Sequence, residues 1–485
     1  MAASPPLRHV AMFPFMAKGH AMPLLHLARL LLGRRLASAV TFFTTPRNAA
    51  FIRAGLAGAG AEAAVVELPF PSEQDAPQST DELPSSTRLV DFVTAVAALQ
   101  PAFGDALARI EPRPDLLVHD GFLRWAKDIA DELGMPRLVT FGFGGFATYV
   151  SRAVTEHRPH AHVSSPSEPF LVHGLPNLRL TKADLNPPFD DPEPSGPHWD
   201  FICKNRISMY SSRGIIVNSF HELESVYIDL WNREFDIKMW PIGPLCLAAS
   251  KPAVQTKDDL EISEWLDSRL ALDRPVLYVA FGSQAELSRA QLEEIAVGLD
   301  NSGVDFLWVV VEGFINQLGV LSHKSVKGFF THCGWNSVLE SIAMGVPILA
   351  FPMAAEQKLN AKFVVDVIHM GLRVWPKEDA DKEGGGLVVS GDVQVLAREL
   401  IFGEEGRRAA ARASELSVSS RKTMEVGGSS FENLAKMVQE VSESETHANA
   451  VKAAGKAPRQ KARGGTRVKG CEQSALNFGV RCRAS

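Results

Sequence analysis

The chain has 485 residues, 46% hydrophobic content and a formal charge of −6 at pH 7, and this length allows two domains of ordinary size. The acidic balance argues against a nucleic-acid-binding surface, and no uninterrupted apolar run is long enough to span a membrane. The first apolar segment, residues 9–15, is typical of a strand and not of a signal peptide, so we expect a cytosolic protein, and we expect a monomer.

Residues 8–45 have the pattern of a strand, a loop, an amphipathic helix and a second strand, which is the opening β-α-β unit of a doubly wound sheet. We expect the loop at residues 16–23 and the helix at 24–35. His20 lies in this loop, at the carboxyl end of the first strand, where sheets of this kind bind ligands. A lone histidine there can be a helix cap or a surface residue, but imidazole also suits proton abstraction near neutral pH.

Residues 114–141 repeat the pattern, with Asp120 at the carboxyl end of the expected strand. An acid in this place can simply cap the following helix. Together with His20, however, Asp120 makes a candidate dyad. A carboxylate bonded to one imidazole nitrogen stabilises the imidazolium that forms when the other nitrogen takes a proton.

Gly142–Ala147 fits the dinucleotide fingerprint G-x-G-x-x-A, which favours an alternative interpretation as an NAD(P)-dependent oxidoreductase. The following thirty residues lack the second strand, ending in an acid, that this interpretation requires. We therefore interpret the segment as one wall of an acceptor pocket, and the loop-rich residues 157–200 as the segment that sets acceptor choice.

A linker is expected at residues 246–259, and it divides the chain into an N-terminal domain, 1–245, and a C-terminal domain, 260–445. The densest signal is the segment 314–357. It combines a buried strand, a short turn from His332, a helix that Gly345 ends, and a second strand. Free N–H groups at the start of that helix are suited to bind an anion such as phosphate.

Several polar side chains around this turn suit a nucleoside diphosphate joined to a sugar. His332 can donate to a phosphate oxygen, Asn336 and Ser337 can cap the helix and reach the same charge, and Glu340 can accept from two ribose hydroxyls. Glu356 and Gln357 offer an acceptor and an amide for further hydroxyls. The plainer alternative is an ordinary capped helix with a buried His and Trp.

The segment THCGWNS, the following Glu, GVP and the closing Glu-Gln resemble the signature box of plant UDP-dependent glycosyltransferases. The resemblance implies an inverting enzyme with two Rossmann-like domains facing a cleft (the GT-B fold), no metal and no cofactor. It implies UDP-sugar, with glucose favoured, as donor and a small lipophilic hydroxylated molecule as acceptor. The site residues that it implies are the catalytic pair His20 and Asp120 and, for the donor, Ser283, Phe314, Gln317, His332, Trp335 through its backbone, Asn336, Ser337, Glu340, Glu356 and Gln357.

Two departures from the family pattern carry their own predictions. Phe314 stands where the family has a Trp that stacks on uracil, so stacking is expected to be weaker. The stretch before Phe314 is short, which predicts that the second sheet lacks one strand. A non-catalytic relative that only binds UDP-sugar is therefore the alternative function.

Other polar clusters are interpreted conservatively. The five cysteines are scattered and are expected to be free thiols. His323, His332 and Cys333 lack a fourth zinc ligand, and Asp379–Asp381 lies in a charged stretch typical of a solvated loop, so no metal site is expected. Residues 446–485 carry nine Lys or Arg against one acid and predict a disordered tail, with a functional basic arm as the alternative.

Overall fold

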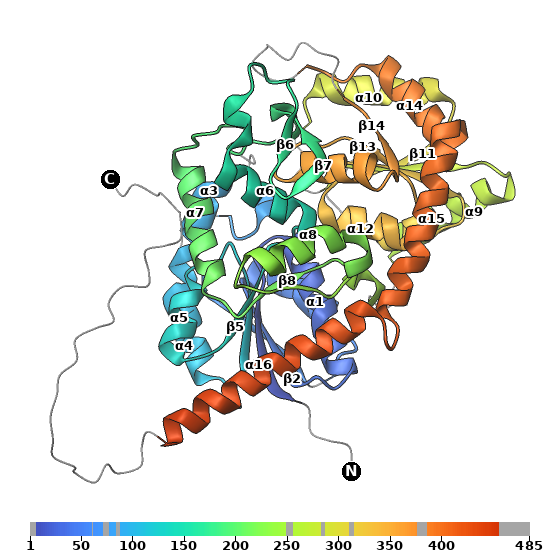
Figure 1. The fold of residues 1–485 in the computed structure, drawn as a ribbon. Helices are drawn as coiled ribbons and strands as arrows, with labels where there is room; N and C mark the ends of the chain where they lie inside the picture. Colours follow the sequence, from blue (N-terminus) through green and yellow to red (C-terminus); the bar gives the residue numbers. More distant parts are fainter. Residues whose placement is uncertain are drawn as a thin grey trace, which may run out of the picture.

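The computed structural model describes residues 6–60, 62–70, 77–83, 88–248, 256–282, 287–309, 315–375 and 386–454, with side chains described as far as residue 443. Two parallel sheets organise these residues, each covered by helices (Figure 1). We call the seven-stranded sheet with its helices the first lobe, and the five-stranded sheet with its helices the second lobe. The α/β fold with two parallel sheets expected from the sequence is confirmed.

The first sheet has the strand order β3-β2-β1-β4-β5-β8-β9, and all of its neighbours pair in parallel. Its strands are β1 Leu7–Phe13, β2 Ala37–Thr44, β3 Ala63–Glu67, β4 Leu116–Asp120, β5 Arg137–Thr140, β8 Ile215–Val217 and β9 Met239–Pro241. The helices of this part are α1 Lys18–Gly33, α2 Pro46–Gly55, α3 Leu89–Val96, α4 Gln100–Arg109, α5 Ala126–Leu133, α6 Gly145–His157, α7 Pro197–Tyr210 and α8 His221–Glu234. Because helices cover both faces, the central strand β4 is buried along its whole length.

Helix α1 begins at Lys18, so the predicted loop over residues 16–23 is wrong from that point, and His20 lies in the first turn of the helix. Pro23, the last residue of the predicted loop, sits inside α1. A proline there removes the N–H that would bond to the Gly19 carbonyl. Asn336 of the second lobe supplies the missing donor to that carbonyl, at 2.6 Å from Nδ2 to O.

The predicted acceptor-selecting segment 157–200 contains a short antiparallel hairpin, β6 Phe170–Val172 and β7 Leu175–Leu180, followed by the 3-10 turn η5 Lys182–Asp184. The segment also holds the 3-10 turn η4 Pro159–His162, the end of α6 and the start of α7, and the stretches between these elements are irregular, as their prolines and serines predict.

The second sheet has the order β11-β10-β12-β13-β14, again with parallel neighbours. Its strands are β10 Val276–Ala280, β11 Asp305–Trp308, β12 Val326–Thr331, β13 Ile348–Ala350 and β14 Gly371–Arg373. Its helices are α9 Lys257–Ala271, α10 Arg289–Ser302, α11 Gln317–Leu321, α12 Trp335–Met344, α13 Gln357–Lys362 with the π-helical turn η7 Phe363–Val367, α14 Ser390–Phe402 and α15 Glu404–Met424. The predicted unit around residue 332 is therefore β12-α12-β13, and Gly345 ends α12 in a left-handed conformation with φ of 73°. The predicted lack of a strand stays a prediction, since residues 310–314 lie outside the described residues.

The last helix, α16 Ser429–Ala454, returns from the second lobe to the first (Figure 1). Its residues Leu434, Met437, Val438 and Val441 are buried in the same cluster as the strands β1 and β2. The helix enters the segment 446–485, so the prediction of disorder is wrong for residues 446–454, while 455–485 lie outside the described residues. Helix α9 likewise begins at Lys257, within the range predicted as linker.

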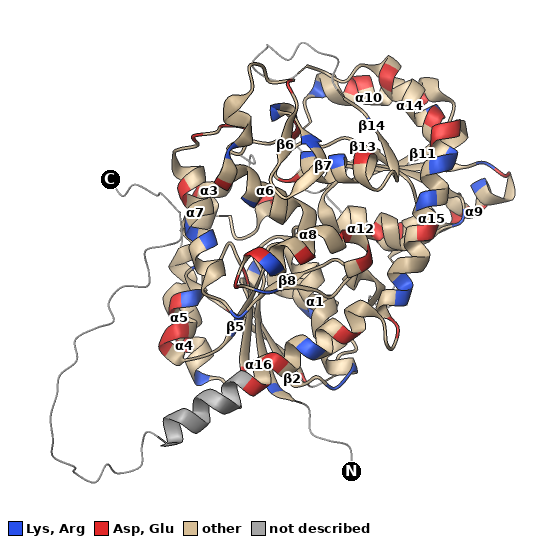
Figure 2. Ribbon diagram, in the orientation of Figure 1, with Lys and Arg blue, Asp and Glu red and all other residues tan. Residues whose placement is uncertain are grey.

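The distribution of charge and one apolar segment bear on two predictions, that the protein binds no nucleic acid and that it does not span a membrane. Figure 2 shows Lys and Arg interspersed with Asp and Glu on helices such as α5, α15 and α16. The segment Leu89–Arg109 is long and apolar enough to cross a membrane by composition alone. Its apolarity has another explanation, because Phe92, Val96 and Phe103 pack in the core of the first lobe.

Candidate active site

His20 and Asp120 meet at the carboxyl edge of the first sheet, as predicted. His20 Nδ1 lies 2.6 Å from Asp120 Oδ2, and the backbone N–H of Phe122 donates to Asp120 Oδ1 at 2.9 Å. The carboxylate is almost fully buried, whereas the His20 side chain is 21% exposed. Asp120 therefore fixes the imidazole on one side and leaves Nε2 for the cleft.

The charge state of His20 results from opposing effects. Burial alone would lower its pKa, but the charge of Asp120 and their hydrogen bond outweigh burial and raise the pKa above 6.5. The charge of Glu356, in the second lobe, adds to this rise. Residues predicted to lie on opposite sides of the cleft are therefore close enough to interact.

An aromatic lining surrounds the exposed side of His20. The rings of Phe15 and Phe122 lie 5.6 and 5.2 Å from the imidazole, and Phe201 of α7 lies 5.3 Å from Phe122. Phe141 and Phe143, from the predicted pocket wall, stack at 6.2 Å. Phe15 is buried, but Phe122, Phe141, Phe143 and Phe201 are partly exposed, and apolar rings in that position suit a lipophilic ligand.

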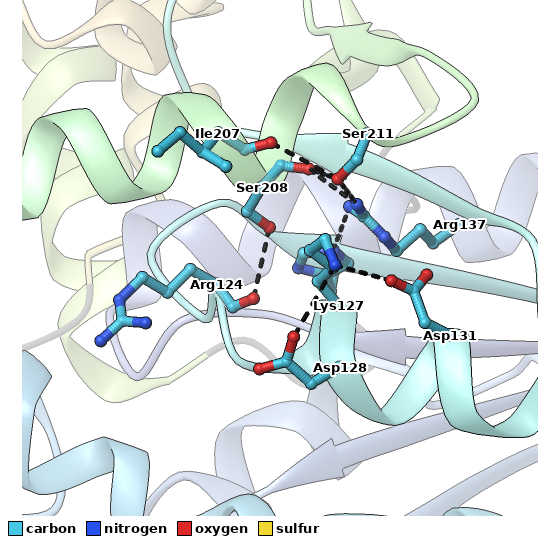
Figure 3. A network of polar contacts seen from close by, with 9 residues as sticks. Arg124, Lys127, Asp128, Asp131, Arg137, Ile207, Ser208 and Ser211 are labelled. Carbon is cyan, nitrogen blue, oxygen red and sulfur yellow. Dashed lines mark hydrogen bonds and ion pairs between the residues drawn. The ribbon is translucent and has the colours of Figure 1, made fainter. Parts of the chain in front are cut away.

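Helix α7 is tied to the rest of the first lobe by the network in Figure 3. Arg137 of β5 donates to the Ser208 carbonyl at 2.7 Å, and Ser208 Oγ donates to the Arg124 carbonyl at 3.2 Å. Close by, Lys127 forms an ion pair with Asp131 at 2.7 Å. The network holds the helix that presents Phe201 to the aromatic lining.

In the second lobe, His332 is enclosed by two glycines. A Cβ atom at Gly282 or Gly334 would lie 2.9 or 2.5 Å from its Nε2, so the ring fits only because both side chains are missing. Burial lowers the pKa of His332 to about 4, and the imidazole is neutral near pH 7. A neutral imidazole can donate one hydrogen bond to an anion.

The first turn of α12 is arranged differently from the prediction. Its N-cap is Gly334, with no side-chain cap, so the expectation that Asn336 and Ser337 cap the helix is wrong. The helix already starts at Trp335, which places both residues inside its first turn. Ser337 Oγ instead accepts from Gln317 Nε2 at 3.1 Å, and the N–H groups of the turn are not capped from within.

Glu340 lies one turn further along α12 and meets Gln317 as well, with 2.6 Å between Gln317 Nε2 and Glu340 Oε2. Burial raises the pKa of Glu340 to about 7. A carboxylate that is costly to hold in this environment gains most from ligand hydroxyls that donate to it.

Glu356 is the N-cap of α13 and Gln357 is its first residue. The Gln357 side-chain oxygen accepts from the N–H groups of Met353 and Ala354, both at 2.9 Å, so its NH₂ group is the part of the amide left to donate. Burial raises the pKa of Glu356, although Asn360 donates to it at 3.2 Å.

The side chain of Trp335 points into the first lobe. Its Nε1 donates to the Asn218 carbonyl at 2.7 Å, and its ring is so close to Gly144 that a Cβ atom there would lie 2.8 Å away. The indole thus joins the lobes, and only the backbone of Trp335 remains for a ligand.

Sequence reasoning missed two polar residues of the first lobe, Asn218 and Glu224. Asn218 follows β8 at the ligand edge of the sheet, a position that could have drawn attention to it. The fully buried Glu224 accepts from the N–H groups of Gly145 and Phe146 at 3.0 and 2.7 Å. The Glu224 carboxylate therefore already binds the N–H groups at the start of α6. In the alternative NAD(P) interpretation, a pyrophosphate would have to bind there.

The remaining candidate residues lie either outside the described residues or away from the site. Ser283, Phe314 and Asp379–Asp381 lie outside the described residues. His323 bonds to Ser325 and Asp267, away from His332. Within the described ranges, no group of three His, Cys, Asp or Glu side chains is arranged to hold a metal.

Comparison with known proteins gives concordant matches. A family model described as UDP-glucoronosyl and UDP-glucosyl transferase matches residues 251–371. UDP-glycosyltransferase 90A1 of Arabidopsis thaliana is 39% identical over 477 residues, which cover 92% of this chain and 98% of the relative. The structure of Glycyrrhiza uralensis UGT73P12, complexed with glycyrrhetinic acid 3-O-monoglucuronide, matches with a TM-score of 0.80 and 28% identity, over 92% of this chain and 99% of that one. Phytolacca americana UGT2, complexed with UDP-2fluoro-glucose and pterostilbene, matches with a TM-score of 0.74 and 26% identity, over 90% of this chain and 100% of that one.

Proposed function

Since this chain belongs to the plant UDP-glycosyltransferase family and has its GT-B fold, we propose that it transfers glucose from UDP-glucose to a hydroxyl of a small lipophilic acceptor, with inversion at the anomeric carbon. The single observation that carries the proposal is the bonded pair His20 and Asp120 beside the uncapped first turn of α12. A base and an anion-binding helix end then face each other across one cleft.

On the acceptor side, His20 Nε2 takes the proton of the acceptor hydroxyl. The oxygen attacks the anomeric carbon, and the bond from that carbon to the diphosphate oxygen breaks, so UDP leaves with the electron pair. The imidazolium that results is stabilised by Asp120 at 2.6 Å. The phenyl rings around His20 support a lipophilic acceptor.

On the donor side, the charge that grows on the departing diphosphate meets the N–H groups of α12 and the side chains of His332, Asn336 and Ser337. These donors are held in place before the reaction, so the proposal needs no metal. Glu340 accepts from the ribose hydroxyls. Ser283 approaches the diphosphate and the sugar.

The sugar and the base are assigned to other residues. Glu356 and the NH₂ group of Gln357 bind sugar hydroxyls, with the Trp335 backbone beside them. The UDP-2fluoro-glucose bound to the Phytolacca enzyme supports glucose as the sugar. Phe314 stacks on uracil, with Gln317 near the base. A cytosolic monomer stays a prediction.

The test is a transfer assay with purified protein, UDP-glucose and a panel of small phenols that includes pterostilbene. Glucoside formation is followed by mass spectrometry and UDP binding by calorimetry. His20→Ala should abolish transfer and leave UDP affinity unchanged, because His20 acts on the acceptor proton. His369→Ala, at an exposed histidine, is the control.

Two results would count against this assignment. An equal loss of transfer and UDP binding in His20→Ala would rule out a role confined to the base. A wild-type protein that binds UDP but transfers to no acceptor would favour the non-catalytic alternative, a UDP-sugar-binding relative.

A further inference from the structure

We propose that Asn218 is a positioning residue for transfer, because it orients the side-chain amide of Asn336 so that an N–H group faces the donor diphosphate next to His20. The inference rests on the proposed function, since it requires the first turn of α12 to hold the diphosphate. It gives a role to a residue of the first lobe that acts through Asn336.

Three hydrogen bonds in series form what we call the interdomain amide chain. The backbone N–H of Leu245 donates to Asn218 Oδ1 at 2.8 Å, and Asn218 Nδ2 lies 3.3 Å from Asn336 Oδ1. Asn336 Nδ2 then donates to the Gly19 carbonyl at 2.6 Å. The chain starts in the first lobe, passes through α12 and ends one residue before His20.

The direction of both amides follows from the two ends of this chain. A backbone N–H can only donate, so the Asn218 atom that it meets is the oxygen, and its NH₂ group faces Asn336. A backbone carbonyl can only accept, so the Asn336 atom beside Gly19 is the nitrogen. Both ends therefore require the same orientation, and a flipped Asn336 amide would place its oxygen against the Gly19 carbonyl.

Pro23 makes the acceptor end of the chain possible. In a regular helix the N–H of residue 23 would donate to the carbonyl of residue 19. Proline has no N–H, so the Gly19 carbonyl takes its donor from Asn336 instead. The helix that carries the base is thus joined directly to the helix that is proposed to bind the diphosphate.

The orientation of the Asn336 amide determines which of its atoms faces the negatively charged diphosphate. The Asn336 NH₂ group has two hydrogens, and the Gly19 carbonyl takes one. The second remains for a diphosphate oxygen. Without the Asn218 donor only the Gly19 carbonyl holds the amide, and a turned amide would present its oxygen to the diphosphate, where the two negative partial charges repel each other.

The test is a double-mutant cycle on Asn218 and Asn336. Asn218→Asp keeps an oxygen for the Leu245 N–H but has no donor for Asn336, and Asn218→Leu removes the donor without adding charge. In the wild-type background each should lower kcat by about tenfold to a hundredfold, since misplacement of a reacting group by about an ångström costs that much. In an Asn336→Ala background the same changes should cost less than about twofold, because there is no amide left to orient.

Asn232→Asp is the matched control. Asn232 lies on α8 and also makes a pair of bonds with its side-chain amide, to the N–H and carbonyl of Met239 at 2.7 and 3.2 Å, both within the first lobe. It should leave kcat and UDP affinity unchanged. The thermal unfolding midpoint is measured for all variants. A lowered kcat with an unchanged midpoint means that the orientation of Asn336 is lost and not the fold.

Additive effects of the Asn218 and Asn336 variants, or wild-type kcat in both Asn218 variants, would overturn the inference. The cycle is also measured on UDP affinity, where coupling is expected in the same direction. This second readout separates the two proposals. A wild-type protein without transfer contradicts the proposed function, whereas absent coupling in UDP binding contradicts the role of Asn218.

Discussion

His20 is the residue at which burial and charge oppose each other most clearly. Burial lowers its pKa and Asp120 raises it, with a net rise above 6.5. Only the neutral imidazole can take a proton, so the transfer rate should increase as the pH rises through this pKa and level off above it. The folded state also holds the proton more tightly than the unfolded chain, so the stability gained from the pair is complete below pH 6.5 and is lost as the pH rises past the folded pKa.

Asp120→Asn tests this balance. The charge that raises the pKa disappears while burial remains, so the pH at which the rate reaches half its maximum should move to lower values. The maximal kcat should fall by about a hundredfold to ten-thousandfold, because the imidazolium is no longer stabilised. The pH profiles of kcat and of kcat/KM measure the two effects. Asp105→Asn, an exposed acid paired with Arg109, is the control, and a profile that moves to higher pH would contradict this account.

The candidate residues were predictable from the sequence where their chemistry is local. His20 and Asp120 each follow a strand with a clear apolar pattern, and the turn at His332 precedes a helix with regular spacing. The orientation of Asn336 could not be predicted, because it depends on Asn218 and Gly19, which are distant in sequence. Glu224 gave no signal for the same reason.

At the scale of the element, the beginning of α1 shows why its boundary was misplaced. Pro23 is a strong local signal for a boundary, and its cost inside a helix is normally high. Here the cost is reduced because Asn336 of the other lobe donates to the Gly19 carbonyl, and the sequence around Pro23 gives no sign of that contact. The unit β12-α12-β13 was predicted well, because its strands, helix and terminal Gly345 depend on short-range preferences alone.

Pro23→Ala should therefore separate stability from activity. Alanine restores an N–H that can donate to the Gly19 carbonyl, a bond of about 1 kcal/mol, so the unfolding free energy should not fall despite the loss of ring packing. The kcat should decrease several-fold, since the restored N–H competes with Asn336 for that carbonyl. Pro46→Ala, at the first position of α2 where no intrahelical bond is possible, is the control. An unchanged kcat in Pro23→Ala would contradict the competition.

At the scale of the molecule, two separate sets of polar contacts join the lobes. One is the interdomain amide chain. In the other, the buried Asp184 of η5 pairs with Arg373 at 3.2 Å and Lys362 at 3.6 Å, both in the second lobe. Asn186 also donates to the carbonyl of Ala355, next to the turn that is proposed to bind the sugar. The first lobe thus contacts the proposed donor-binding residues of the second lobe through two separate groups of polar contacts.

The return of α16 to the first lobe gives the whole chain a further connection, which Leu434→Ala tests. Leu434 is 1% exposed within the cluster that contains β1, β2 and β9 residues, although it follows the second lobe in sequence. Its truncation should lower the unfolding free energy by about 2–5 kcal/mol, because it leaves a cavity in a packed core. Denaturant unfolding measures this loss.

Hydrogen exchange locates the same loss within the molecule. Amide exchange in Leu434→Ala should accelerate in β9, which α16 covers, and stay unchanged in β13 of the second lobe. Val426→Ala, at a side chain that is 85% exposed just before α16, should change the unfolding free energy by less than about 0.5 kcal/mol. Faster exchange confined to β13 would mean that α16 stabilises the second lobe instead. Faster exchange in β9 would mean that the lobe that contains His20 depends on a helix encoded after the second lobe.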